Sequence, residues 1–463
     1  MNQLLEKLYF QSPVFVQNIM TTMYGYKLYY ERYLGKHDKY LQELLESQWY
    51  SDDEIEKLTN QKLQAILKYA TKYVPYYKKL QQNGDFDTAQ IKHVSDLTKL
   101  PILKKEDIRE QPDKYISTKF KKSELIAINT SGTTGKTLKI YVDKNSRRYS
   151  YAFYTRLKNW AGISGNDKNI TFAGRTIVPP DSSTPPFWRS NPAWHNYLFS
   201  SYHLSTENIK FYIDKITEIN PVFIDSYPSS IYTLAKYMKE YQINKIKPKA
   251  IITSSETLLD SQREIIEEVF NCSVFDQYGC AEQVVFVSQC EKGSYHINPE
   301  YGIVEFIRED GSLAKCGEEA RLICTGFTNY AMPLIRYDIG DTGILSNKKC
   351  ACGRNFPVIE KIVGRTDDIL IMRDGRQVGR LDPVFKGLQT IKEAQIVQED
   401  FDNVILNVVP GKLFQISDAE TVVHELKKRL GTNINVHINV VSRIKRTSSG
   451  KFRAVISKVR KEK

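Results

Sequence analysis

Val222-Phe-Ile-Asp225 opens a segment in which short apolar runs alternate with helical patterns. A helical pattern follows from Ser229 to Tyr241, and the next apolar run is Ile251-Ile-Thr-Ser254. A second helical pattern, from Ser261 to Phe270, separates that run from Val274-Phe-Asp-Gln-Tyr278. Strands that alternate with helices of this length are typical of a parallel sheet, because the helical crossovers cover both of its faces. The segment therefore predicts an α/β fold.

The amino-terminal side of this segment adds one more strand and a helical region. Ile170-Thr-Phe-Ala173 has the composition of a strand. The first 80 residues instead have apolar positions at helical spacing, as in Tyr40 to Leu45 and Leu63 to Ala70. Ser51-Asp-Asp-Glu54 matches a capping box and predicts the start of a helix. Residues 1–100 are therefore expected to be the helical region of a large domain.

The carboxy-terminal side has a different pattern. Short strands such as Val404-Ile-Leu-Asn-Val-Val409 follow Val363. One helix is expected to open with the capping box Ser417-Asp-Ala-Glu420 and to close at Gly431. We place a boundary near residues 364–368. The prediction is a large domain that continues over residues 101–366 and a small α+β domain over residues 367–463.

The composition excludes several classes of protein. Of 463 residues, 41% are hydrophobic and 26% charged, and 24 Gly with 17 Pro are too few for a collagen-like or low-complexity chain. No apolar stretch approaches the roughly 18 residues of a membrane span. The first residues, Met1 to Ser12, lack a basic region followed by an apolar one. We expect a cytoplasmic protein with no membrane span.

The net charge of +12 admits acidic partners, namely nucleotides, nucleic acid or an anionic membrane surface. Part of this excess is local, because the residues from Ser442 to Lys463 include nine Lys or Arg and one Glu. Composition alone leaves two interpretations of this tail open, a nucleic-acid-binding segment and a solvated terminus.

The clearest local motif is Thr130-Ser-Gly-Thr-Thr-Gly-Lys136. Its small and hydroxylated residues present backbone N–H groups without obstruction, and its hydroxyls and lysine add further donors, which suits a phosphate chain. The spacing differs from that of the common P-loop, because four residues do not separate a glycine from Gly-Lys-Ser/Thr. A Ser/Gly turn without a ligand is the alternative interpretation.

Four further motifs follow in order along the chain. They are Gln277-Tyr-Gly-Cys-Ala-Glu282, Arg336-Tyr-Asp-Ile-Gly-Asp341, Gly364-Arg-Thr-Asp-Asp368 and Arg446-Thr-Ser-Ser-Gly-Lys451-Phe-Arg453. Together with the first motif, they resemble the adenylate-forming superfamily of acyl- and aryl-CoA synthetases. The resemblance covers nearly the whole chain and is greatest to the phenylacetate-CoA ligase-like family and its capsular-polysaccharide-biosynthesis branch. It implies a large amino-terminal domain, a small mobile carboxy-terminal domain, and ATP-dependent activation of a carboxylic acid.

The resemblance assigns nucleotide contacts to named residues. The β- and γ-phosphates would be held by Thr130, Ser131, Gly132, Thr133, Thr134 and Gly135, with Lys136 adding positive charge at the mouth of the loop. Relatives usually have Pro where Thr137 stands, which puts the stiffness of the loop in doubt but leaves its donors in place. On the adenine side the resemblance places Tyr278, Gly279, Ser255 and Glu256.

Four charged residues complete the implied site. Asp341 resembles the carboxylate that accepts hydrogen bonds from both ribose hydroxyls, a role that suits an ionised acceptor, although an ordinary Gly-Asp turn would look the same. Glu282 would bind Mg²⁺, which prefers hard oxygen ligands. Arg365 would contact ribose or phosphate, and Asp367 would be the hinge of the small domain.

Lys451 would neutralise the carboxylate and the α-phosphate as they approach each other. The implied reaction has two halves: the carboxylate displaces pyrophosphate from MgATP, and a nucleophile, usually the thiol of coenzyme A, then takes the acyl group. Nucleotidyl transfer depends on positioning and charge, so no protein nucleophile is needed. Cys280 is accordingly interpreted as a residue that lines the pocket.

A structural zinc site is the second prediction. Cys290, His296, Cys350 and Cys352 provide three thiolates and one imidazole, a set that suits tetrahedral zinc, and some relatives carry a similar set. Four protein ligands would leave no open coordination position, so the metal would fasten loops. The remaining cysteines, Cys272, Cys316 and Cys324, are expected to be small buried apolar residues.

Several questions stay open at this point. One alternative is an adenylating ligase that transfers the acyl group to an amine or hydroxyl in polysaccharide biosynthesis. A distant one is a zinc-containing nucleic-acid-binding protein, although the role implied for Lys451 explains much of the basic tail and no nucleic-acid partner is expected. The substrate is expected to be a small carboxylic acid, and the oligomeric state is undetermined, a homodimer included.

The residues of the acid pocket are also undetermined. Candidates are the side chains of Trp188, Trp194, Tyr227 and Pro228, which come from distant segments of the chain. His195 and His203 lie among aromatic residues and are interpreted as core or pocket wall rather than as catalytic bases.

Overall fold

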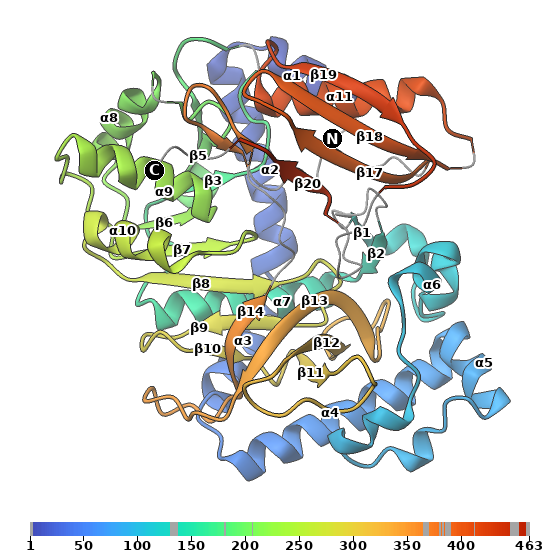
Figure 1. Cartoon of the computed structure of the whole chain (residues 1–463). Coiled ribbons are helices and arrows are strands. Elements are labelled where there is room, and N and C mark those ends of the chain that lie inside the picture. The colour runs from blue at the N-terminus through green and yellow to red at the C-terminus, as the bar shows by residue number, and fades with distance from the viewer. Residues whose placement is uncertain are drawn as a thin grey trace.

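The structure is a computed structural model (Figure 1). It describes residues 3–129, 138–179, 182–205, 207–363, 370–378, 381, 384, 390–411, 413–444 and 453–459. Among these, no helix is long and apolar enough to cross a membrane.

The amino-terminal region is helical, as its apolar periodicity predicts. Its long helices are α1 (Gln3–Gln11), α2 (Val14–Tyr33), α3 (His37–Ser47), α4 (Asp52–Tyr73) and α5 (Pro75–Asn83). The capping box at the start of α4 is confirmed, because the Ser51 hydroxyl accepts from the backbone N–H of Glu54 while the Glu54 carboxylate accepts from the backbone of Ser51. Short elements then lead to the sheet: η1 (Thr88–Gln90), η2 (Val94–Lys99), α6 (Lys105–Glu110), η3 (Pro112–Tyr115), η4 (Lys122–Glu124) and the hairpin of β1 (Ile126–Asn129) and β2 (Lys139–Val142).

A parallel sheet forms the centre of the molecule, as the alternating segment predicts. Its strands lie in the order β5, β3, β6, β7, β8 and are all parallel. The elements of this half are α7 (Lys144–Trp160), β3 (Asn169–Ala173), β4 (Trp188–Asn191), η5 (Pro192–Trp194), β5 (Asn196–Ser200), α8 (Ile209–Ile219), β6 (Phe223–Ser226), α9 (Pro228–Glu240), β7 (Ala250–Ser254), α10 (Asp260–Phe270) and β8 (Val274–Gly279).

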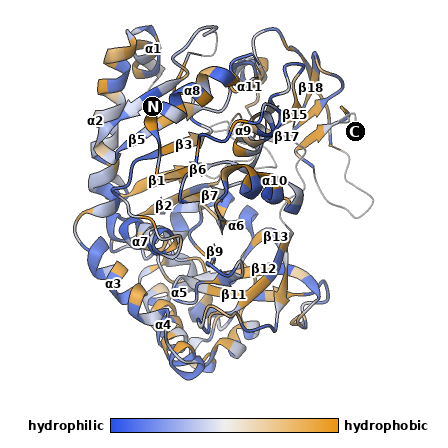
Figure 2. Ribbon diagram, turned by 90° about the vertical axis from the view of Figure 1, so that its left-hand side faces the viewer, coloured by the Kyte–Doolittle hydropathy of each residue, from blue (hydrophilic) through white to orange (hydrophobic). Residues whose placement is uncertain are grey.

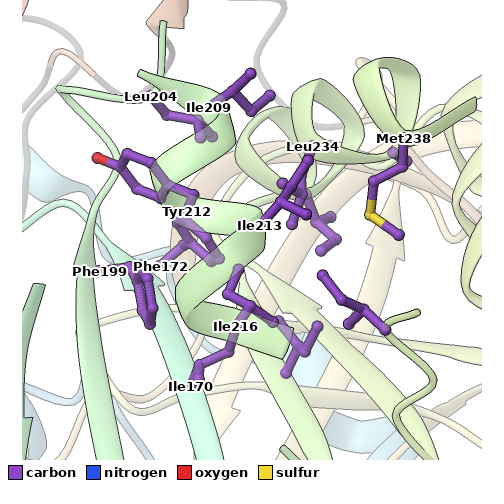
Figure 3. Packing of buried hydrophobic residues seen from close by; sticks show 14 of the residues in the cluster. Ile170, Phe172, Phe199, Leu204, Ile209, Tyr212, Ile213, Ile216, Leu234 and Met238 are labelled. Atoms are coloured by element: carbon purple, nitrogen blue, oxygen red, sulfur yellow. The ribbon is translucent and has the colours of Figure 1, made fainter. Parts of the chain in front are cut away.

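Helices cover both faces of this sheet because successive strand residues point to opposite sides. Ile224 and Ile251 pack with α8, α9 and α10 on one face, whereas Phe223 and Ile252 pack with α7 on the other. Figure 3 shows the first of these cores, where Ile216 of α8 lies among the buried side chains of the sheet. Burial of each large apolar side chain stabilises the fold by about 1.5–3 kcal/mol.

Beyond β8 the sheet changes character, which the alternating pattern did not predict. The next strands are antiparallel: β9 (Phe286–Gln289), β10 (Tyr295–Ile297), β11 (Gly302–Ile307), β12 (Glu319–Gly326), β13 (Tyr337–Ser346) and β14 (Val358–Val363). β4 is also antiparallel, at the opposite edge. Within the described residues, the expected parallel sheet therefore makes up five strands of a twelve-stranded mixed sheet.

The carboxy-terminal unit has a separate sheet and core. Its elements are β15 (Leu370–Ile371), β16 (Gln377–Val378), β17 (Ile391–Gln398), β18 (Asn403–Pro410), α11 (Ile416–Leu430), β19 (Asn435–Val440) and β20 (Val455–Ser457). The expected closure of the helix at Gly431 is confirmed, but its expected start is wrong. The N-cap is Gln415, two residues before the expected Ser417, and the capping carboxylate is Asp418, which accepts from the backbone of Gln415.

Polar contacts between described residues join this unit to the rest of the molecule. Arg376 donates to the carbonyl oxygens of Tyr202 and, at 2.9 Å, of Leu430. The Lys428 ammonium lies 3.4 Å from the Glu6 carboxylate of α1. The last helix thereby contacts the first one, as Figure 1 also shows. The predicted domain boundary at residues 364–368 lies outside the described residues.

Candidate functional site

Two of the sequence motifs meet at the carboxyl edge of the parallel sheet. β6, β7 and β8 end there, in a register that sets Ser226 against Thr253 and Ser254 against Gln277. Ligands of open α/β sheets bind at this edge. At the end of β8, the Tyr278 hydroxyl donates to Asp341 Oδ2 at 2.7 Å. Burial raises the pKa of Tyr278, so its hydroxyl keeps the proton that it donates.

The glycine and the loop predicted for the adenine lie beside this pair. A Cβ atom on Gly279 would lie 2.7 Å from the Gln277 side chain, so only glycine fits without a shift. Ser255 has a φ of +73°, a left-handed conformation that turns the chain sharply after β7. The Glu256 carboxylate accepts from the backbone N–H of Ser229 at 3.0 Å, near the amino end of α9. A carboxylate is favourable at this end of a helix dipole.

Glu282 is buried and already has two partners. Its Oε1 accepts from the Tyr337 hydroxyl at 3.0 Å and lies 3.5 Å from the Lys105 ammonium. The sequence analysis missed both partners. Tyr337 lies inside one of the motifs, but Lys105 gave no signal, since it is one of two adjacent lysines at the start of a short helix.

Arg336, the first residue of the same motif, has a structural role. Its guanidinium makes two 3.0 Å contacts with the buried Glu305 carboxylate, from Nε to Oε2 and from Nη2 to Oε1. Its φ of +49° is left-handed, and its backbone N–H donates to Thr325 Oγ1. The pair fixes the turn that carries the chain from β12 into β13, and so it positions Asp341.

A cavity of about 730 Å³ is lined by Gly279 but not by Asp341. This volume suits a small organic ligand. Cys280 lines the cavity, and burial raises its pKa to about 12, which keeps the thiol protonated and agrees with its interpretation as a lining residue. Trp194 also lines it, whereas Trp188, Tyr227 and Pro228 do not. Trp188 packs on Phe199 instead.

Further corrections concern cysteines and histidines away from this cavity. Cys324 is buried as expected, but Cys272 is half-buried and Cys316 is exposed, because it lies in the turn that joins β11 to β12. His203 is buried and stacks on Phe187, with its Nδ1 2.7 Å from the Ser200 hydroxyl, which makes it a core residue. His195 is exposed.

The four predicted zinc ligands come together although they arrive from two separate hairpins. Cys290 directly follows β9, His296 lies in β10, and Cys350 and Cys352 lie between β13 and β14. Their ligand atoms all lie within 4.8 Å of one another. Cys290 Sγ is 3.6 Å from Cys350 Sγ, and Cys352 Sγ is 3.3 Å from His296 Nε2.

These separations fit a tetrahedral ion. With metal–sulfur bonds of about 2.3 Å, two ligands of one tetrahedral zinc lie about 3.8 Å apart. His296 Nδ1 lies 3.3 Å from the Phe356 carbonyl oxygen, a contact that leaves Nε2 directed at the cysteines. Burial lowers the pKa of His296 to about 4, so the imidazole is neutral at pH 7 and able to bind a metal.

Several predicted residues lie outside the described part of the chain. They are the phosphate-loop residues Thr130 to Lys136, together with Thr137, Arg365, Asp367 and Lys451. Their roles remain predictions.

Comparisons with known proteins agree with the motifs. A family described as the CapK C-terminal domain matches residues 370–458. Protein CapK of Staphylococcus aureus is 30% identical over 466 residues, which cover 99% of this chain and 100% of that protein. Phenylacetate-coenzyme A ligase of Thermus thermophilus is 23% identical, over 87% of this chain and 96% of that one.

A solved structure of 2-hydroxyisobutyryl-CoA ligase has the same fold. The TM-score is 0.58 at 20% identity, over 88% of this chain and 91% of that one. The identity to CapK over the full length of both proteins is the decisive finding. This chain belongs to the CapK branch of the phenylacetate-CoA ligase-like family, within the adenylate-forming superfamily.

Proposed function

We propose that this chain joins a carboxylic acid to coenzyme A in two steps. In the first, a carboxylate oxygen attacks the α-phosphorus of MgATP and pyrophosphate leaves, which gives an acyl-adenylate. In the second, the thiol of coenzyme A attacks the acyl carbon, gives up its proton, and AMP leaves. The observation that carries this proposal is the contact between Tyr278 and Asp341, residues of two motifs that meet beside a cavity at the ligand-binding edge of the sheet.

The nucleotide would lie on the Asp341 side of the cavity mouth. A carboxylate can accept about four hydrogen bonds, so the bond from Tyr278 is compatible with further bonds from two ribose hydroxyls. Tyr278 also holds the carboxylate in one orientation before the nucleotide arrives, which lowers the cost of binding. The phosphates would bind to residues 130–136, as the motif predicts.

Two charged residues would act on the first step. Glu282 offers the hard oxygen donor that Mg²⁺ prefers, and the ion would compete with Lys105 for it. Lys451 would reduce the repulsion between the carboxylate and the α-phosphate. Residues 1–366 and 367–463 are proposed as two domains that rotate about Asp367 between the two steps, with Arg365 beside the nucleotide.

We also propose a structural zinc ion at Cys290, His296, Cys350 and Cys352. The separations of the donor atoms support this, and so does the chemistry of the set, three soft sulfurs and one imidazole. A metal with four protein ligands would fasten the β9–β10 turn to the segment before β14. It would take no part in either step.

The proposal is tested by acid-dependent exchange of labelled pyrophosphate into ATP, over a panel of aryl, short-chain, hydroxylated and dicarboxylic acids. We expect exchange without coenzyme A, and a thioester with AMP after its addition. A panel in which no acid supports exchange would contradict the proposed function.

The acceptor is tested separately, because CapK similarity extends over the whole chain. If the adenylate forms but coenzyme A does not discharge it, amino sugars and sugar alcohols are added in its place. An ester or amide would then identify the second candidate, acyl transfer in polysaccharide biosynthesis.

A further inference from the structure

The wall of the 730 Å³ cavity combines apolar side chains, such as Leu41 and Phe286, with a group of charged and hydroxylated ones. One face of α7 contributes Arg147, Tyr151, Tyr154 and Lys158, which recur at helical spacing. The carboxyl end of α2 contributes Arg32, which lies against Tyr151 of this face. An aryl or short aliphatic acid would leave these groups without partners.

Arg32 is buried, and nothing among the described residues neutralises it. The residue is 8% exposed, and its Nε has no hydrogen-bond partner in the described part of the chain. Its guanidinium lies 4.4 Å from the ring centroid of Tyr151 and 5.1 Å from that of Trp194. These rings stabilise the cation by cation–π interactions but do not neutralise its charge. Arg147, by contrast, lies 3.8 Å from Glu31.

Lys158 and Asp225 lie deeper in the same cavity. The Lys158 ammonium lies over the rings of Phe223 and Tyr154, 4.8 Å and 5.0 Å from their centroids. The Tyr154 hydroxyl donates to Asp225 Oδ2 at 2.5 Å. Burial lowers the pKa of Lys158 and raises that of Asp225, because removal from water disfavours the charged form of each group. Arg32 and Lys158 thus share one buried carboxylate, Asp225, because the Asp38 side chain of the same wall is 87% exposed.

The strand register gives the depth of these groups. Asp225 pairs with Ile252, and Ile252 pairs with Phe275. Gly279, which also lines the cavity, lies four residues beyond Phe275 on β8, which is roughly 13 Å along the strand. An acid that is activated beside Gly279 would therefore need a long body before its far end reached Arg32 and Lys158.

We propose that the cavity selects a carboxylic acid with a second negatively charged group at its far end, which Arg32 and Lys158 bind. This inference rests on the proposed function, since the first carboxylate is the one that is activated. Charge-assisted hydrogen bonds in a cavity of this kind favour the doubly charged acid, and the rings of Tyr151 and Tyr154 would pack along the middle of its chain.

The test compares pairs of acids of equal length: suberate with octanoate, sebacate with decanoate, and dodecanedioate with dodecanoate. We expect pyrophosphate exchange to favour the dicarboxylates in kcat/KM. Arg32→Met and Lys158→Met should each lower that preference about 10- to 100-fold. Arg32→Lys should retain part of it. Lys27→Met, on the exposed side of the same helix, is the matched control and should leave it unchanged.

The outcomes separate the two proposals. Equal or faster exchange with the monocarboxylates would overturn this inference and leave the proposed function standing. A preference that survives both substitutions, in variants with unchanged thermal unfolding, would overturn it as well. If no acid supported pyrophosphate exchange, the proposed function and this inference would be overturned together.

A second inference comes from the outer face of α2. This face carries five large side chains, each more than half exposed, which we call the outer stripe: Phe15, Ile19, Met23, Tyr26 and Tyr30. Figure 2 shows α1 and α2 along one edge of the molecule, with no other element outside them. The opposite face of α2 is buried through Gln17, Gly25, Leu28 and Arg32. The helix is therefore apolar on the side that faces solvent.

The exposed area is that of an interface. Together with Leu5 and Leu8 of α1, the outer stripe exposes on the order of 800 Å². The largest apolar patch of a typical monomer is about 300–600 Å². Two copies would bury about 1,600 Å², which is the size of a standard protein interface. Tyr, Phe and Met are also enriched in interfaces, and the stripe contains no Lys or Glu.

We propose that the outer stripe pairs with itself in a two-fold homodimer. An antiparallel crossing centred between Thr22 and Met23 sets Phe15 opposite Tyr30 of the second copy, and Ile19 opposite Tyr26. Each pairing then occurs twice, as an isologous interface requires. A membrane surface is less favoured, because interfacial helices carry many Lys and Arg beside their apolar face and Lys27 is the one basic residue within the span of the stripe.

Analytical ultracentrifugation of the full chain tests this pairing. We expect a dimer at micromolar concentration, and monomers for Ile19→Glu and Met23→Glu with thermal unfolding unchanged. Cysteines at positions 19 and 26 of one chain should give a disulfide-linked dimer on oxidation, whereas a single cysteine at position 27 should not. A monomeric wild type would overturn the inference, and so would a monomer that sediments with anionic phosphatidylserine vesicles through the same residues.

Discussion

Replacement of Asp341 by alanine tests the nucleotide side of the site at the level of single hydroxyl groups. Asp341 is held by the 2.7 Å hydrogen bond from Tyr278, and the proposal gives it two ribose hydroxyls to accept from. A hydrogen bond to a charged group contributes about 1.5–3 kcal/mol, or roughly 10- to 150-fold. Loss of the hydrogen bonds from both ribose hydroxyls should therefore lower kcat/KM for ATP by about 10²- to 10⁴-fold.

The assay measures acid-dependent pyrophosphate exchange with ATP, 2′-deoxyATP and 3′-deoxyATP. The wild type should use each deoxynucleotide about 10- to 150-fold less well than ATP, because each lacks one of the two donors. Asp341→Ala should use all three at similar low rates. Tyr278→Phe is the matched variant: it keeps the carboxylate but removes the group that orients it, so discrimination should persist in part.

One result would refute the reasoning directly. If Asp341→Ala lost activity but still preferred ATP over both deoxynucleotides, the carboxylate would not be the ribose acceptor. Its contact with Tyr278 would then be a structural feature of the β8 and β13 ends.

Three further predictions concern the remaining parts of the site. Lys451→Ala should abolish adenylate formation and leave thioester formation from supplied acyl-AMP much less affected, as single-turnover assays of each half can show. Cys350→Ser with Cys352→Ser should lose about one zinc per chain by elemental analysis and lower the unfolding temperature, and zinc-free wild type would contradict this. Asp367→Pro should slow acyl transfer by orders of magnitude more than adenylation, because proline fixes φ at the proposed hinge. Unchanged transfer would rule that hinge out.

The parallel half of the fold could be predicted because its information is local. Ile251 and its neighbours form a continuous apolar run, and such runs between helical patterns are specific to buried parallel strands. The antiparallel half could not be predicted in this way. Its strand β10 has only three residues and pairs with β14, about sixty residues later in the chain. A pairing of this kind is set by tertiary packing, and no local sequence pattern predicts it.

The same distinction separates the parts of the site. Cys350 and Cys352 could be recognised because two thiols this close in sequence have few other uses. Arg32 and Lys158 could not, because a cation on an amphipathic helix looks like a solvated residue until the fold places another element against it. Asp225 stands near the carboxyl end of a predicted strand, which was a signal that the sequence analysis did not use.

The change from parallel to antiparallel pairing at β8 has a consequence for synthesis on the ribosome. When residue 279 has emerged, β3 and β5 to β8 can already form a five-stranded sheet, but the outer edge of β8 lacks the partner that β9 later supplies. Unpaired backbone groups on such an edge are templates for aggregation. Gene fragments or premature stop codons that end the chain between residues 279 and 286 should therefore yield insoluble protein, and truncation after residue 363 should not.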